Sequence, residues 1–200
     1  MKMRIVADSS ANLLEMKDVE FASVPVHIIV GEQDYADTAE IDLAAFQQHL
    51  RDYKGKTTTA APSPGEWEEA FGDADVIFCF TLASVDNFAK NGRVSHVIAK
   101  GIGLIGIRIV GTAGPEGTLD FKGKCRGDKK ALALILEKMK ELGYKGGRVV
   151  IAHNQNEEAA LQLKMRIEEL FGYFNGVIHP ERALCCYYAE PGSVMVGFEA

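Results

Sequence analysis

The run Val76–Phe80, with the sequence VIFCF, consists of five apolar residues in succession. A strand with one face in water alternates apolar and polar residues, so this run predicts a strand that is buried on both faces. A second apolar run, MRIVA at Met3–Ala7, predicts a similar strand. Strands of this kind are typical of parallel sheets that carry helices on both sides.

Segments with helical spacing separate the predicted strands along the chain. The predicted strands cover residues 3–7, 21–30, 76–80, 149–152, 176–178 and 194–198, and the predicted helices cover 11–16, 43–53, 64–71, 85–100, 128–142 and 157–171. Glycine and proline near residue 115 predict a hairpin turn. The alternation predicts an α/β fold with largely parallel sheets and flanking helices, arranged in two lobes.

The composition is that of an ordinary globular protein with an acidic balance. The 200 residues carry a formal net charge of -6 at pH 7, which argues against a nucleic-acid partner because phosphate binding needs a basic surface. There is no run of 18 uncharged apolar residues, so we expect no stable membrane insertion. The four cysteines form no CxxC pair, and we expect a reduced, cytoplasmic protein.

One short motif matches a nucleotide-binding pattern in the wrong structural context. Residues 101–106 are GIGLIG, which fits the GxGxxG pattern of dinucleotide-binding proteins. That pattern needs a strand before it and a helix after it, whereas here the predicted helix comes first and the strand second. We interpret the motif as a close-packed turn, and we expect no nucleotide cofactor.

Asp8, Ser9 and Ser10 follow the first predicted strand, at the sheet edge where ligands bind in open α/β folds. The same residues could instead cap the next helix, and the sequence leaves both interpretations open. His153 ends a later strand and could also face a cleft. Metal-ligand spacing such as HxxxH and the GxSxG nucleophile motif do not occur, so the sequence offers no metal site and no complete catalytic set.

Three consecutive threonines, Thr57–Thr59, come before a proline-rich stretch. Hydroxyl groups on a loop stiffened by proline can donate hydrogen bonds to an anion at low entropic cost. The alternative is a solvated turn in which one threonine caps a helix. Ser63 is the predicted N-cap of the helix that follows, with Pro64 in its first turn.

Several segments together resemble the DegV family, the bacterial fatty-acid-binding proteins. They occur in the order of the family and extend over nearly the whole chain. The two segments that contain PSPGE and DNFAKNGR are the most specific. The matching segments are IVADSSANL (5–13), TTTAAPSPGEW (57–67), SVDNFAKNGRVS (84–95), GLIGIRIV (103–110), KCRGDKKAL (124–132) and EPGSVMVGF (190–198).

The resemblance implies two α/β lobes, which would be residues 1–81 and 82–200 of this chain. It also implies a long-chain fatty acid held between the lobes, with its tail buried. Members of the best understood type are carriers without enzymatic activity, and they present the fatty acid to a separate kinase subunit that phosphorylates its carboxylate. The resemblance implies no metal or other cofactor, and at most a transient contact with a membrane.

The resemblance further implies roles for individual residues. Thr59 matches the threonine that binds the fatty-acid carboxylate. Arg93 matches an arginine at the headgroup opening, where a guanidinium could receive an acyl phosphate. Asp8, Ser9 and Gly192 are expected near the same opening and partner surface.

The chain departs from the family pattern in three places. After Thr81 it lacks the serine-rich segment SGTxxSA and several dozen further residues, so either this member is shorter or the sequence omits a segment. Ser84 is the nearest remaining hydroxyl and only a weak second ligand for the carboxylate. Tyr188 replaces a histidine that many members have; it can donate a hydrogen bond but carries no positive charge near neutral pH. Ala60 replaces a hydroxyl residue.

Two other functions stay open from the sequence. The first is a small-molecule α/β enzyme that acts at the edge formed by Asp8, Ser9 and Ser10, with His153 as its base. The second is a regulatory module that senses lipid and reports to a partner. Extraction of bound lipid would separate the carrier and the sensor from the enzyme, and capture of a kinase subunit would separate the carrier from the sensor.

Overall fold

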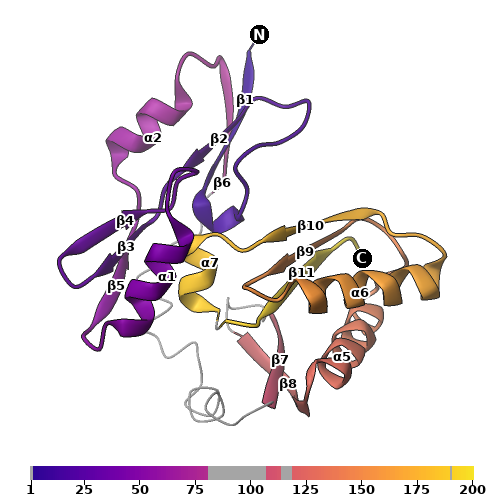
Figure 1. Cartoon of the computed structure of the whole chain (residues 1–200). Helices are drawn as coiled ribbons and strands as arrows, with labels where there is room; N and C mark the ends of the chain where they lie inside the picture. Colours follow the sequence, from indigo (N-terminus) through magenta and orange to yellow (C-terminus); the bar gives the residue numbers. More distant parts are fainter. Residues whose placement is uncertain (1, 81–106, 114–118, 190) are drawn as a thin grey trace. The chain divides into compact units, whose positions relative to one another are not determined.

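The computed structural model describes residues 2–80, 107–113, 119–189 and 191–200 (Figure 1). These residues fall into two compact units. The described parts of the units are residues 2–80 with 181–189, and residues 107–113 and 119–180 with 191–200. In all four described ranges, no helix is both long enough and apolar enough to cross a lipid bilayer.

A parallel sheet with the strand order β2-β1-β6 forms one half of the first unit. Its strands are β1 (Met3–Asp8), β2 (Phe21–Val24) and β6 (Val76–Phe80). Helix α2 (Pro64–Phe71) packs on one face of this sheet, where the Arg4 guanidinium donates to carbonyl oxygens at the end of the helix. The chain crosses over the sheet between successive strands, as parallel pairing requires.

Helix α2 begins where the sequence predicted. The Ser63 hydroxyl accepts a hydrogen bond from Glu66 N at 3.3 Å, and the Glu66 carboxylate accepts one from Ser63 N at 2.7 Å, which completes a capping box. Pro64 occupies the first turn, where a backbone N–H has no partner within the helix. The capping box fixes the point at which the chain turns from β5 (Thr57–Ala60) into the helix.

An antiparallel sheet with the order β4-β3-β5 forms the other half of the first unit. Its other strands are β3 (His27–Val30) and β4 (Gln33–Ala36), and the helices α1 (Leu43–Asp52) and α7 (Ala183–Tyr188) pack with it. Burial of apolar side chains between these elements stabilises them. The buried residues of this core are Val26, Ile28, Val30, Phe46, Ala183 and Leu184.

A three-stranded mixed sheet with the order β10-β9-β11 is the centre of the second unit. Strand β9 (Val149–His153) pairs in parallel with β10 (Gly176–Pro180) and antiparallel with β11 (Val194–Phe198). Helices α5 (Asp128–Glu141) and α6 (Glu157–Phe171) pack with the sheet. The buried core residues are Leu132, Leu136, Met139, Tyr144, Val149, Ile151, Ala159, Ala160, Leu163 and Ile167.

Two smaller elements complete the described chain. Strands β7 (Ile107–Ala113) and β8 (Leu119–Arg126) form an antiparallel pair, as the predicted hairpin requires. The short helix η1 (Ser9–Ala11) is a single 3-10 turn in place of the helix expected over residues 11–16. It ends at Asn12, whose φ of 57° is in the left-handed region and cannot continue a right-handed helix.

The α/β class predicted from the sequence is confirmed. Parallel pairing occurs in the β2-β1-β6 sheet and between β9 and β10, and the other strand pairs of the described residues are antiparallel. The strand predicted over residues 21–30, which the sequence breaks at Pro25, is two strands in different sheets, and Pro25 between them has no N–H to donate to a ladder. The threonines, which we expected in a loop, lie on β5 at the edge of the antiparallel sheet.

One prediction about a strand was wrong. Strand β6 exists, but Phe78 and Cys79 on it are exposed, so the strand is not buried on both faces. In the second unit, the N-cap of α5 is Gly127, and the carboxylate of Asp128 in the first turn pairs with the Arg108 guanidinium of β7.

The segment of residues 181–189 departs from the expected division of the chain. We expected all of residues 82–200 to form one lobe. This segment belongs instead to the first unit, where Ala183 and Leu184 of α7 are buried in the core under β3 and α1. A site in the first unit can therefore combine side chains from the two ends of the sequence.

Candidate ligand-binding site

Strand register decides which of the three threonines face the core of the first unit. On β5, Thr59 pairs with Ile28 of β3, Thr57 pairs with Val30, and Thr58 pairs with Ile29. Paired residues point to the same side of a sheet, and Ile28 and Val30 are core residues. Thr57 and Thr59 therefore point toward α7, and Thr58 points away from it.

Helix α7 brings two tyrosine hydroxyls to these two threonines. The Tyr188 hydroxyl lies 3.2 Å from Thr59 Oγ1, and the Tyr187 hydroxyl lies 2.9 Å from Thr57 Oγ1. The two tyrosine rings meet edge to face, with their centroids 4.9 Å apart. Thr59 is buried, whereas Tyr188 is 40% exposed, so this pair of hydroxyls runs from the interior toward the surface.

These hydroxyl pairs can serve an anionic ligand without any charge of their own. A Thr or Tyr hydroxyl can rotate its hydrogen toward another hydroxyl or toward a carboxylate. Two such donors side by side match the two oxygens of one carboxylate. A hydrogen bond to an ionised acceptor is shorter and stronger than one between two neutral groups. This difference favours replacing the contact between two hydroxyls with a contact from each hydroxyl to the carboxylate.

Asp37 fixes the position of α7. Its carboxylate is fully buried and accepts hydrogen bonds from Ala183 N and Leu184 N, each at 3.2 Å, and from Arg182 Nη2 at 3.3 Å. Asn12 adds a fourth contact, because its side-chain oxygen accepts from Arg182 N at 2.7 Å. No local sequence pattern indicates these roles of Asp37 and Asn12, since their partners lie 145 or more residues away in the chain.

Asp8, Ser9 and Ser10 make local structural contacts. The Asp8 side chain accepts from Ser10 N at 3.0 Å and from the Ser10 hydroxyl, as an N-cap of η1. The Ser9 hydroxyl is buried and accepts from Val26 N at 3.1 Å. These contacts support the capping interpretation, and a role of Asp8 and Ser9 at a ligand opening stays a prediction.

His153 and Gly192 lie together in the second unit. His153 pairs with Val194 at the end of β9, and its Nδ1 atom is buried without a hydrogen-bond partner among the described residues. Gly192 has a φ of 92°, and its N–H donates to Asn154 O at 2.7 Å in the turn before β11. Since Ser9 belongs to the first unit, the structure gives no support to a Ser9–His153 pair.

Two of the expected site residues, Ser84 and Arg93, lie outside the described residues, as does the GIGLIG motif. Within the described ranges, no three His, Cys, Asp or Glu side chains are grouped so that they could hold a metal ion. Burial raises the pKa of Cys185 to about 12 and that of Cys186 to about 11, so neither thiol is a ready nucleophile at neutral pH.

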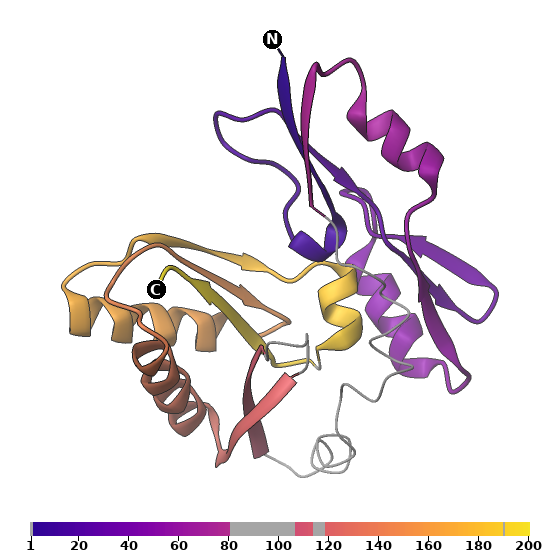
Figure 2. The same ribbon diagram turned by 180° about the vertical axis from the view of Figure 1, so that it is seen from behind.

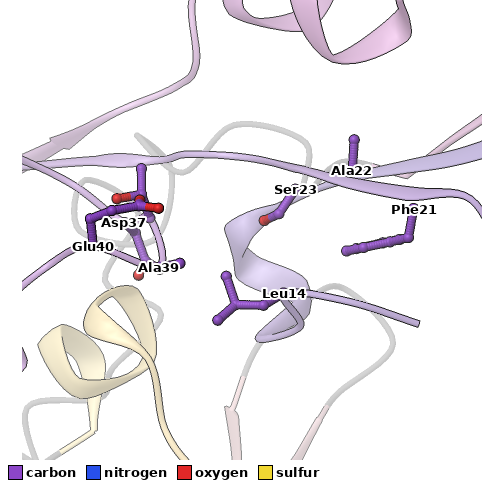
Figure 3. Close-up of a pocket in the computed structure, with 8 residues that line it drawn as sticks. Leu14, Phe21, Ala22, Ser23, Asp37, Ala39 and Glu40 are labelled. Carbon is purple, nitrogen blue, oxygen red and sulfur yellow. The ribbon is translucent and has the colours of Figure 1, made fainter. Parts of the chain in front are cut away.

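A hollow of about 340 Å³ lies at the edge of the parallel sheet in the first unit. Phe21 and Leu14 line one side of it, and Asp37 and Glu40 lie on the other (Figure 3). Neither Thr59 nor a residue of α7 lines this hollow. Asp37 in its lining is already engaged by Arg182, Ala183 and Leu184, and the hollow is separate from the hydroxyls of Thr59 and Tyr188.

Comparison with known proteins identifies the family. A family profile described as "Uncharacterised protein, DegV family" matches residues 2–84 and 73–200. The chain belongs to the DegV family. The two matched ranges meet around the end of β6, where the sequence departs from the family pattern.

The DegV relatives are longer than this chain. A DegV domain-containing protein of Streptococcus gordonii is 27% identical over 279 aligned positions, which cover 100% of this chain and 99% of the relative. The alignment has 79 more positions than the 200 residues of this chain. A DegV domain-containing protein of Streptococcus pyogenes is 45% identical over 122 residues, or 60% of this chain.

Two solved DegV structures combine a similar fold with a bound fatty acid. A DegV family protein of Eubacterium eligens, loaded with heptadecanoic acid, has a TM-score of 0.91 and 28% identity, with 99% of each chain covered. The fatty acid kinase B3 protein of Streptococcus pneumoniae, loaded with linoleic acid, has a TM-score of 0.87 and 28% identity. That likeness covers 100% of this chain and 99% of the pneumococcal protein.

Proposed function

We propose that this chain binds a long-chain fatty acid and presents its carboxyl group to a fatty acid kinase partner. The observation that carries the proposal is the full-length likeness to the pneumococcal fatty acid kinase B3 protein, which was solved with linoleic acid bound. The protein is then a carrier and does no chemistry on its ligand. It works in the cytoplasm, which agrees with four free cysteines.

Burial of the tail supplies the affinity. About 15 methylene groups contribute roughly 12 kcal/mol at about 0.8 kcal/mol for each buried CH₂. Immobilisation of the ligand offsets several kcal/mol of that gain. The protein therefore needs polar contacts at only one end of the ligand, to fix its register and to satisfy the carboxylate.

Thr59 and Tyr188 are the proposed carboxylate ligands. Their hydroxyl oxygens are 3.2 Å apart, and Thr59 is almost inaccessible to water. A carboxylate placed there without donors would lose its hydration and gain nothing in return. Two neutral donors supply that need without an acid, a base or a metal. Arg93 keeps its proposed role at the headgroup opening, and Ser84 is the weaker proposed ligand.

Phosphorylation by a kinase tests the presentation step. The chain loaded with radiolabelled oleate is mixed with ATP and a bacterial fatty acid kinase subunit, and acyl phosphate is trapped with hydroxylamine. We expect ATP-dependent formation of the hydroxamate, and none without the kinase. If the loaded chain gives no product while a known carrier does, the chain binds lipid without presenting it, as a sensor would.

A further inference from the structure

The second hydroxyl pair, Thr57 with Tyr187, has no part in the carboxylate site proposed above. Its oxygens are 2.9 Å apart, closer than the 3.2 Å between the hydroxyls of Thr59 and Tyr188. Thr57 and Thr59 are two residues apart on β5, which separates the two pairs by about 6.6 Å along the strand. The two oxygens of a carboxylate share one carbon atom, so one carboxylate cannot engage both pairs.

Helix α7 is short, and its two ends are held in different ways. The helix lies beside α1 in both views (Figure 1 and Figure 2). In its first turn, the backbone N–H groups of Ala183 and Leu184 donate to the Asp37 carboxylate. Its last two residues are Tyr187 and Tyr188, whose hydroxyls lie within hydrogen-bond distance of β5. The contacts with β5 therefore act at the end of the helix that Asp37 does not reach.

Under the proposed function, binding of a carboxylate breaks one of these two contacts with β5. The hydroxyls of Thr59 and Tyr188 lie within hydrogen-bond distance of each other. Each hydroxyl has a single hydrogen to donate, and a carboxylate only accepts hydrogen bonds. When both hydroxyls donate to the ligand, neither can donate to the other. The bond between Thr57 and Tyr187 is not used by the ligand and still joins α7 to β5.

We propose that Tyr187 is a positioning residue for the fatty-acid carboxylate, an inference that rests on the proposed function. Its hydrogen bond to Thr57 holds the end of α7 on β5 while Thr59 and Tyr188 donate to the ligand. The rings of Tyr187 and Tyr188 meet edge to face, with their centroids 4.9 Å apart and an angle of 79° between their planes. A fixed Tyr187 ring limits the orientations of the Tyr188 ring, and so directs the Tyr188 hydroxyl toward the carboxylate.

Tyr187→Phe removes the hydroxyl and keeps the ring, so it tests the hydrogen bond separately from the packing. We expect the affinity for oleate to fall about 3- to 10-fold, as for the loss of one hydrogen bond between neutral groups. The affinity for oleyl alcohol should fall less, because the contact of the alcohol with Tyr188 is uncharged. Thr57→Val should act like Tyr187→Phe, and Thr57→Ser, which keeps a hydroxyl, should bind oleate like wild type. Titration calorimetry measures both ligands.

A second hydrogen bond between a strand and a helix of the same core supplies the control. The Tyr35 hydroxyl on β4 lies 2.7 Å from His49 Nδ1 on α1, and Tyr35 packs against the same buried residues as Tyr187. Tyr35→Phe should lower the stability to urea, as Tyr187→Phe does, but should leave the ratio of oleate affinity to oleyl alcohol affinity unchanged. Tyr187→Phe should lower that ratio. A variant that only loosens the core would weaken the binding of acid and alcohol alike.

A double-mutant cycle with Tyr188→Phe shows whether Tyr187 acts through Tyr188. If it does, Tyr187→Phe causes no further loss of oleate affinity in a chain that already carries Tyr188→Phe. An equal loss in both backgrounds overturns the proposal, and so does a Tyr187→Phe variant that binds oleate like wild type. A wild-type chain that binds neither ligand contradicts the proposed function and this inference with it. If circular dichroism shows that Tyr187→Phe is unfolded, Thr57→Val replaces it in the same cycle.

Discussion

Thr58 and Thr59 are neighbours in sequence but face opposite sides of β5. The alternation of side chains along a strand puts Thr59 on the buried side with Ile28, and Thr58 on the other side with Ile29. Substitution of Thr59 therefore tests the proposed carboxylate contact, and the same substitution of the adjacent Thr58 is its control. Only one of them can reach the hydroxyl of Tyr188.

Thr59→Val should lower the affinity for a fatty acid about 10- to 150-fold, since a hydrogen bond to a charged group contributes roughly 1.5–3 kcal/mol. The affinity for the fatty alcohol of the same length should fall much less, because that bond is uncharged. Titration calorimetry of both ligands against wild type and variant checks this. Thr58→Val should change neither affinity. If Thr59→Val binds the acid as tightly as wild type, the carboxylate lies elsewhere.

The sequence singled out some of the residues of the proposed site. The resemblance to the DegV family assigned Thr59, and it noted Tyr188 in place of a histidine. It did not predict that the two hydroxyls meet, because they are 129 residues apart and no local pattern encodes such a contact. Tyr187, which pairs with Thr57 in the same way, was not singled out at all.

His27 should make the stability of the first unit depend on pH. Its Nδ1 lies 2.9 and 3.0 Å from the Asp34 carboxylate oxygens, and its Nε2 lies 2.9 Å from Glu66 Oε1. Burial lowers the pKa of His27, but the hydrogen bonds to Glu66 and Asp34 outweigh burial and raise it above 6.5. The His27 hydrogen bond, followed by contacts with Ser63, lowers the pKa of Glu66 to about 2.

The signs of the two shifts define a window of pH. A raised histidine pKa stabilises the fold fully below about 6.5, and that stabilisation is lost as pH rises through the folded value. A lowered glutamate pKa stabilises it above about 4.5, and that stabilisation is lost as pH falls toward 2. The stability advantage of wild type over His27→Gln in urea unfolding should thus be larger at pH 5.5 than at pH 8.5. An advantage independent of pH would show that His27 is not charged.

At the scale of elements, most helices and strands followed from local patterns. The Ser63 cap of α2 was readable because a cap and its helix are adjacent in sequence. Helix α7 was missed, since it has six residues and no side-chain cap of its own. Its anchor is Asp37, which comes 146 residues before Ala183 in the sequence. Only the folded structure brings Asp37 and α7 together.

Asp37→Asn should destabilise α7. The substitution removes the charge that Arg182 faces in a buried position, and breaking one partner of a buried ion pair costs about 3–5 kcal/mol. We expect faster hydrogen exchange in residues 181–189 and weaker fatty-acid binding, because α7 carries Tyr188. The control is Asp52→Asn at the exposed end of α1. Unchanged exchange in residues 181–189 would contradict the anchoring role of Asp37.

At the scale of the whole molecule, the α/β class followed from the alternation of strands and helices. The expectation that Val76–Phe80 is buried on both faces was wrong, because Phe78 and Cys79 are exposed. An apolar run shows that a strand is suited to burial, but segments distant in sequence decide which of its faces are covered. The fatty-acid tail needs an enclosed apolar surface along most of its length.

Native mass spectrometry of the chain purified from a bacterial host, followed by solvent extraction, tests the central claim most directly. Tail burial should hold the ligand through purification, so we expect each chain to carry one fatty acid of about 16 to 18 carbons, with the mass of the complex matching the extracted acid. Added oleate should exchange with the bound lipid. A chain that is isolated without lipid and does not bind added palmitate or oleate would contradict the assignment as a fatty-acid carrier.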